Sequence, residues 1–598
     1  MLKIVTLICA LAGLLTALSL ESWIRSRIVR NDVSAGTFAE TKNRNLEFWS
    51  IQYAPLAILI VLIGAAIFAF VGHLNAAVFL GGAVLCLISV ITGSVTVVSG
   101  SIASSSNAVE GDIRTALKTA YRSAAVMGLS VTSIALLGLG ALFLFLNTNQ
   151  LVSLVASFAL GASVVALGLG ISGTAYSGAY ALTVRKDDFT DYTGMFIGSG
   201  ADLVETYILS ACSAALLAGV GVDTSGVLST FTATSAARYP LIVLATGIVA
   251  SVIGIMIYRA YIVKNPAAGV TWGNFAAALV IILVSFYFSN VVLQSYVYAA
   301  CVGAGVIAAL AAGEASKAYS LDGFVFRRFL PDIRKTGAAQ SMIYSLSIGM
   351  ISVVIPAVIT TAAIIIAYKF ANFYGIALAA VGINSMAAVN SAVRGFSINT
   401  ASASEIASVS DPEAESPNPA DVLLTASAKS DAVGKTYTAV SAYVTLVAMF
   451  TALSVVGNNM STNLLSTNVF TGIMAGAVTV FVCAGLIIRS IRLTSQVLRA
   501  RLDSYDPQKR ISALRGLVPI FLISLTLPLA AGAAGGINGL IAFACSATVT
   551  GMCVIFTFNY SGRFFDRMAT ETLGTVIKLM VAVTLVAAPL FMEFGGIF

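Results

Sequence analysis

Charged side chains are scarce in this sequence: Asp, Glu, Lys and Arg make up 10% of its 598 residues, against roughly a quarter in an ordinary soluble protein. There is one histidine, His73, so histidine-based catalysis or zinc binding has almost no basis. The seven cysteines lie in apolar stretches without metal-ligand spacing, which indicates core packing. No polar stretch is long enough for a soluble domain, so we expect residues 1–598 to form a single integral membrane domain.

Hydrophobic residues make up 58% of the chain and recur in long runs. A helix needs about 20 apolar residues to cross a hydrocarbon core roughly 30 Å thick. The sequence therefore predicts an all-α polytopic membrane protein with about 16 transmembrane helices. The runs lie near 4–22, 53–72, 76–99, 124–147, 151–183, 194–220, 240–262, 273–290, 292–313, 341–369, 374–400, 433–456, 466–488, 515–534, 536–558 and 573–594.

Lysines and arginines gather in alternate connections between these runs. Because cytoplasmic loops of membrane proteins carry an excess of Lys and Arg, we expect the basic connections to be cytoplasmic and both termini to lie on the other side. The bias also explains the net charge of +7 without any nucleic acid partner. The simplest location is a prokaryotic plasma membrane. The expected cytoplasmic loops span about 100–123, 314–340, 401–432 and 489–514.

A few charged residues lie well inside apolar runs. Asp202 and Glu205 fall in the sixth run, three residues apart and so on one face of a helix, and Lys578 falls in the sixteenth. A charge near the bilayer centre costs at least about 2.5–3.5 kcal/mol, and such groups pair with one another or line a water-filled path. We expect Lys578 to face both acids, either as a structural ion pair that fixes helix register or as part of an ion or proton path. Arg394 lies nearer the end of its run, where it is able to snorkel.

The segment around these acids resembles a known family. Gly198-Ser-Gly-Ala-Asp202-Leu-Val-Glu205-Thr-Tyr207 is similar to the G-x-G-A-D-L-F-E-S-Y segment of the membrane-integral pyrophosphatases, which are pyrophosphate-driven proton and sodium pumps. Asp431-Ala-Val-Gly-Lys-Thr436 resembles that family's D-A-A-G-N-T. Val576-Ile-Lys-Leu-Met580 resembles part of its last helix. The order of these segments and the number of spans also agree.

The resemblance implies more than the residues do by themselves. It implies a sixteen-helix subunit in a homodimer, with an inner ring of six helices that hold Mg²⁺ and pyrophosphate at the cytoplasmic end. It also implies an ion gate below that site, made by an Asp, a Glu and a Lys. On this chain the gate roles fall on Asp202, Glu205 and Lys578, the residues already selected by the cost of burying them.

The hydrolytic segments of the family are largely missing. Its acidic loop after the fifth helix has no counterpart here, and neither does the acid- and lysine-rich stretch before its last helix. Lys435 stands where an asparagine is expected, and Asn399 lies in a segment that has lost its acid. The residual cytoplasmic site comprises Asp187, Asp188, Asp191, Asn399, Asp431, Lys435 and Asp566, with Asp187, Asp191 and Asp431 as the ligands if Mg²⁺ binds.

Pyrophosphate carries roughly three to four negative charges, and phosphoryl transfer depends on metals and cations that hold them in line. Few acids remain to bind these metals, so three functions stay open. The chain is a catalytically degenerate relative that keeps an H⁺ or Na⁺ gate, which we favour, or an active pump with a reduced site. The third possibility is a membrane scaffold within a larger complex, where a partner protein supplies the activity.

Overall fold

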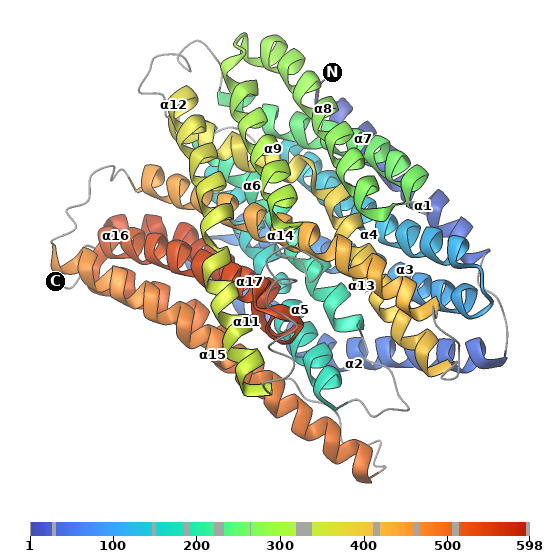
Figure 1. Cartoon of the computed structure of the whole chain (residues 1–598). Coiled ribbons are helices and arrows are strands. Elements are labelled where there is room, and N and C mark those ends of the chain that lie inside the picture. Colours follow the sequence, from blue (N-terminus) through green and yellow to red (C-terminus); the bar gives the residue numbers. More distant parts are fainter. Residues whose placement is uncertain are drawn as a thin grey trace.

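The structure is a computed structural model of the 598-residue chain. It describes residues 2–26, 32–145, 151–183, 192–219, 233–262, 265–317, 338–410, 419–457, 466–504 and 514–593. Within these ranges every regular element is an α-helix (Figure 1). The helices are α1 (Leu2–Arg25), α2 (Asp32–Phe70), α3 (His73–Val109), α4 (Ile113–Phe145), α5 (Leu151–Thr183), α6 (Thr193–Gly219), α7 (Ala233–Tyr261), α8 (Pro266–Leu293), α9 (Val297–Ser316), α11 (Ala338–Ser352), α12 (Val354–Ser385), α13 (Ala387–Ser410), α14 (Pro419–Val456), α15 (Thr467–Ser504), α16 (Leu514–Tyr560) and α17 (Gly562–Glu593).

Fourteen continuous segments of the described chain are long and apolar enough to cross a membrane, and two of them are long enough to cross it twice. The segments Met342–Ser385 and Val518–Tyr560 contain 44 and 43 residues, about 65 Å each if straight, twice the hydrocarbon thickness. Each contains a break, at Ala371 and Asn372 in α12 and at Gly536 in α16.

The chain folds back at both breaks. A Cβ added to Gly375 would lie 2.1 Å from the carbonyl oxygen of Ala367, and one added to Gly539 would lie 2.7 Å from that of Ala531. Residues eight apart in a straight helix are about 12 Å apart, so these contacts require a reversal. Gly536 has φ 62 and ψ −155, a conformation that is open essentially to glycine alone. After the break in α12 that segment continues only to Ser385, so α13 (Ala387–Ser410) is needed to complete the second crossing. Counted in this way, the fourteen segments allow sixteen crossings, in agreement with the number that the sequence predicts.

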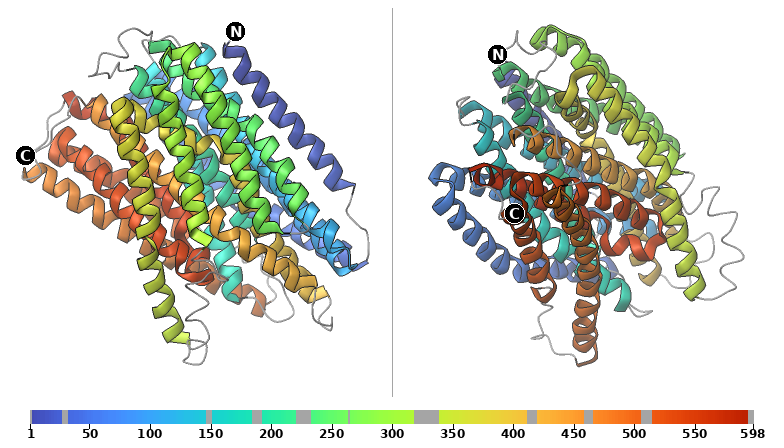
Figure 2. Two further views of the ribbon diagram at one scale, coloured as in Figure 1. Left: turned by 45° about the horizontal axis from the view of Figure 1, so that its top comes forward. Right: turned by 90° about the vertical axis from the view of Figure 1, so that its left-hand side faces the viewer.

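Helices α5 and α6 form the centre of the bundle. The apolar windows of their membrane spans are 100% and 94% buried, whereas the window in the span of α2 is only 22% buried. Helix α6 packs against α3, α4, α5, α7, α12, α14 and α17. The other helices lie around this pair, and most of them run in a similar direction in the left-hand view of Figure 2. The helix that carries Asp202 and Glu205 is therefore among the most enclosed in the molecule.

Reciprocal glycine contacts bring the central helices close together. A Cβ on Gly161 of α5 would lie 2.1 Å from the Phe79 carbonyl oxygen of α3, and a Cβ on Gly82 of α3 would lie 2.2 Å from that of Phe158. Membrane helices associate through close packing of this kind, because lipid gives no hydrophobic drive between them.

The helices extend further than the apolar runs, so the expected loops are too long. Range 100–123 was expected to be a loop, but α3 continues to Val109 and α4 begins at Ile113. The serine-rich end of α3 is helical, and its hydroxyls donate to carbonyls about one turn earlier, as Ser101 does to Val98. Asp112 then caps α4 by accepting from the Thr115 hydroxyl and amide, bonds that hold the pKa of this carboxyl below its usual range.

The other three expected loops are also shortened by helix. Helix α13 continues to Ser410 and α14 begins at Pro419, inside the range 401–432. Helix α15 runs to Ser504, well into the range 489–514. Helices α9 and α11 enter the range 314–340 from its two ends. The parts of these ranges between the helices lie outside the described residues.

The glycine contacts predict a sharp difference between two substitutions. Gly161→Leu forces a side chain into the α3 backbone and should destabilise the bundle by about 1–3 kcal/mol. Gly485→Leu on α15 is the control, because a Cβ there meets nothing within 4 Å. Melting temperatures of the purified variants in detergent measure the effect. Equal melting temperatures would contradict the close packing of α3 on α5.

Candidate functional site

Three charged side chains meet between α6 and α17. The Lys578 ammonium donates to Asp202 Oδ1 at 2.5 Å and to the Thr206 hydroxyl at 2.6 Å. Its nitrogen lies 3.2 Å from Glu205 Oε2. Asp202 is 2% exposed, and Glu205 and Lys578 are 0% exposed. The structure thus brings Lys578 against both acids, as the cost of isolated charges in a membrane predicts.

Helix geometry and neighbouring contacts fix this arrangement. Asp202, Glu205 and Thr206 are three and four residues apart and share one face of α6. Helix α17 is anchored on α5, where the Thr572 hydroxyl donates to the Gly170 carbonyl at 3.0 Å. Because α5, α6 and α17 pack on one another, Lys578 has little freedom to leave the two acids.

Glu205 is the least satisfied member of the three. Apart from the ion pair with Lys578, neither of its carboxylate oxygens has a hydrogen-bond partner among the described residues. The Ser163 hydroxyl of α5 lies beside it. Two acids and one base carry a net charge of −1, which a single bound proton or monovalent cation would neutralise. A group of this composition suits the passage of one such ion.

A second charged cluster lies next to the first and joins α13, α14 and α17. Arg394 forms an ion pair with Asp431 at 2.5 Å and with Glu571 at 3.0 Å. Lys435 forms another with Asp431, and the Ser397 hydroxyl donates to Asp431 at 3.0 Å. The Arg394 side chain is 4% exposed, the Glu571 side chain 14% and the Asp431 side chain 26%. Among the described residues the cluster contains two bases and two acids, whose charges balance.

Two small cavities lie between the charged groups. Asp202 and Thr438 line both of them. One cavity continues to Lys435 and Glu571, and the other continues to Arg394. Each has about 10 Å³ of room, close to the space that one water molecule needs. Single waters in these cavities would link Asp202 to both sides of the Arg394–Glu571 ion pair.

The other residues of the predicted cytoplasmic site either lie elsewhere or are outside the described residues. Asn399 is not part of the cluster: its amide donates to the Ala120 carbonyl at 3.1 Å and to the Ser123 hydroxyl, which holds α13 on α4. Asp187, Asp188 and Asp191 lie outside the described residues, as does the side chain of Asp566. The structure therefore unites only Asp431 and Lys435 of that set.

Sequence reasoning missed two members of the cluster. Arg394 was expected to snorkel, but it is buried and bound to two acids, because α14 and α17 cover it. Glu571 was not selected at all. Its signal was its position seven residues before Lys578, which puts both on one face of α17.

An all-helical bundle in which fourteen segments of the described chain are long and apolar enough to cross a membrane defines a polytopic integral membrane protein. The comparisons with known proteins identify the family. The model of the family described as "Inorganic H+ pyrophosphatase" matches residues 11–182 and 183–499. This chain belongs to that family.

Three relatives illustrate the likeness. One is a putative K(+)-stimulated pyrophosphate-energized sodium pump of Clostridium tetani, 24% identical over 81% of this chain and 75% of its own. A second is a K(+)-insensitive pyrophosphate-energized proton pump of Methanosarcina mazei, 26% identical over 80% of this chain and 75% of its own. The third is a protein of the same name from Caldanaerobacter subterraneus, 26% identical over 88% of this chain and 86% of its own.

The buried trio predicts a strong dependence of stability on charge balance. Lys578→Met leaves two buried acids without a counter-charge and should destabilise the protein by about 3–5 kcal/mol. The triple variant Asp202→Asn, Glu205→Gln, Lys578→Met removes all three charges and should recover most of this loss. Melting temperatures of the two variants test the order. A triple variant less stable than Lys578→Met would contradict mutual neutralisation of the trio.

Proposed function

We propose that this protein is a catalytically degenerate relative of the membrane pyrophosphatases that retains their ion gate. Asp202, Glu205 and Lys578 pass or block a proton or a sodium ion, and pyrophosphate hydrolysis does not drive the step. The protein acts as a homodimer in a prokaryotic plasma membrane, with both termini on the non-cytoplasmic side.

The observation that carries this proposal is the state of Asp431. One of its oxygens is bound to Arg394 and Ser397, and the other is bound to Lys435. In phosphoryl-transfer chemistry a carboxylate at such a site would serve a metal that holds a phosphate. Here the basic side chains of Arg394 and Lys435 bind the carboxylate instead. A second acid, Glu571, also forms an ion pair with Arg394.

The described residues do not fit Mg²⁺ well. Mg²⁺ takes oxygen ligands, usually one or two carboxylates together with substrate phosphates. In the part of the chain that the structure describes, no three acids, histidines or cysteines come together as a metal site. The two carboxylates of the second charged cluster, Asp431 and Glu571, both form ion pairs with a basic side chain. This cluster is therefore built for internal ion pairing rather than for holding a metal.

One observation favours a second candidate, an active pyrophosphate-driven pump with a reduced site. The likeness to relatives named as pumps extends over most of the chain, 88% of it for the protein of Caldanaerobacter subterraneus. Asp187, Asp191 and Asp431 would then hold Mg²⁺. A scaffold role, in which the trio only locks α6 to α17 and a partner protein supplies the activity, is the third candidate.

Phosphate release separates the first two candidates. The purified protein should release no phosphate from Mg²⁺-pyrophosphate above the protein-free background, with or without K⁺ and Na⁺. The pump of Caldanaerobacter subterraneus serves as the positive control, because its name states a pyrophosphate-energised activity. Magnesium-dependent turnover that Asp431→Asn abolishes would overturn the proposed degeneracy and support the reduced-site pump.

Ion flux separates the gate from the scaffold. In vesicles with an imposed H⁺ or Na⁺ gradient, Glu205→Gln and Lys578→Met should change the flux that the unmodified protein supports, because each removes a charge from the ion's path. Asp112→Asn is the matched control, an acid-to-amide change in the exposed α3–α4 connection. If folded variants at Glu205 and Lys578 support the same ion flux as the unmodified protein, the gate hypothesis is wrong and the scaffold role is favoured.

A further inference from the structure

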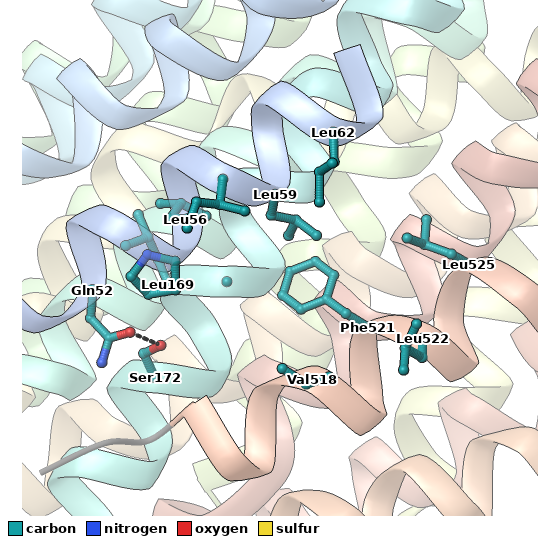
Figure 3. Close-up of a pocket in the computed structure, with 13 residues that line it drawn as sticks. Gln52, Leu56, Leu59, Leu62, Leu169, Ser172, Val518, Phe521, Leu522 and Leu525 are labelled. Atoms are coloured by element: carbon teal, nitrogen blue, oxygen red, sulfur yellow. Dashed lines mark hydrogen bonds between the residues drawn. The ribbon is translucent and has the colours of Figure 1, made fainter. Parts of the chain in front are cut away.

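An apolar groove opens between α2, α5 and α16, away from all of the charged groups described above (Figure 3). Its volume is about 360 Å³. Leu56 of α2, Leu169 of α5 and Phe521 of α16 form its floor and are 7%, 0% and 6% exposed. Leu62, Val518 and Leu522 form its rim and are 63%, 51% and 56% exposed. The groove therefore opens sideways, from a buried floor to the outer surface of the bundle.

The groove lies within three membrane-spanning segments, Asn43–Phe70, Ser153–Thr183 and Val518–Tyr560. The medium at its mouth is therefore lipid hydrocarbon rather than water. Helices α2 and α16 have their main partners elsewhere, α3 for the first and α15 and α17 for the second. The space between them is left to be filled from the membrane.

The chemistry of the walls excludes a polar ligand. The lining contains two polar side chains, Gln52 and Ser172, and they bond to each other: the Ser172 hydroxyl donates to Gln52 Oε1 at 2.7 Å. Figure 3 shows this pair at one end of the groove, with apolar side chains along the rest. A ligand that needs several hydrogen bonds would leave them unmade here, whereas a hydrocarbon chain needs none.

We propose that this groove is a binding site for one acyl chain of a membrane lipid. Its volume of about 360 Å³ suits one alkyl chain and is too small for a protein helix, which is about 10–12 Å across with its side chains. The chain enters through the rim formed by Leu62, Val518 and Leu522 and lies on Leu56, Leu169 and Phe521. An empty apolar space of this size would forfeit the contacts that hydrocarbon otherwise makes with its walls.

The position of the groove on α5 gives the bound chain a structural role. Gly168, Leu169 and Ser172 face the groove. Gly170 and Thr174 lie on the opposite face of the same helix, where Thr572 of α17 bonds to both. The acyl chain thus packs against the side of α5 that is opposite its contact with Thr572, which precedes Lys578 on α17 by six residues, about one and two-thirds helical turns.

The test uses the purified full chain and one variant that fills the groove. A Cβ on Gly168 would lie 2.7 Å from Leu56 Cδ1, so Gly168→Phe places a ring in the groove. Gly485→Phe adds the same ring to the exposed surface of α15, where a Cβ meets nothing within 4 Å. After extensive washing in mild detergent, native mass spectrometry counts the phospholipids that remain on each protein.

The unmodified protein and Gly485→Phe should each retain one phospholipid per chain, and Gly168→Phe should retain about tenfold less. Added phospholipid should raise the melting temperature of the first two proteins but not that of Gly168→Phe. Equal retention by all three proteins, or no retention by any, would overturn the proposal. Loss of a dimer in Gly168→Phe without loss of lipid would also overturn it and assign the groove to a second copy of the chain.

A second measurement needs no variant and covers the case in which Gly168→Phe does not fold. The unmodified protein is placed in phosphatidylcholine nanodiscs that contain a lipid with a photoreactive acyl chain. Peptides of α2, α5 and α16 that line the groove should be labelled in preference to the exposed apolar faces of α8 and α15. Even labelling of all lipid-facing helices would mean ordinary surrounding lipid only and would refute the site.

Discussion

The cost of placing charge in hydrocarbon governs this structure. An ionised side chain inside a membrane must meet an opposite charge or an ion, and the buried charges of both central clusters do so. Most of the opposing partners come from different helices, so these ion pairs also fix how the helices lie. Asp202 and Lys578 join α6 to α17, and Arg394 joins α13 to both α14 and α17. The buried charges are therefore neutralised only when the central helices are packed correctly.

The two charged groups differ in a way that bears on function. Among the described side chains, the cluster around Arg394 balances two bases against two acids. The trio around Lys578 carries one more acid than base, and Glu205 has unused hydrogen-bonding capacity in a fully buried position. A site with an uncompensated charge changes state when one ion binds, whereas a balanced cluster resists change. The trio is therefore the group whose charge balance a single bound ion would change.

Much of this arrangement follows from the sequence, and the remainder has a physical reason for escaping it. The spans and the trio were predictable because long apolar runs form membrane helices and charges isolated within such runs must find one another. The pairing of Arg394 with Glu571 was not, because these residues are 177 positions apart and their contact depends on how α13 packs on α17. Helix ends were misplaced because hydropathy marks where the membrane ends, whereas serine and small residues let α3 continue beyond it. Asn399 was placed in the cytoplasmic site because of its position in a motif, but its amide donates to the backbone of α4 and so has a structural role.

Helix α5 brings these observations together. It has no charged residue in its membrane span, yet it contacts the trio through Ser163, α17 through Gly170 and Thr174, and the apolar groove through Leu169. Glycines on several of its faces allow its neighbours to approach its backbone, which leaves few side chains to resist displacement. A helix of this kind is positioned by what surrounds it. Whatever fills the groove therefore helps to determine how firmly α17 holds Lys578 against Asp202 and Glu205.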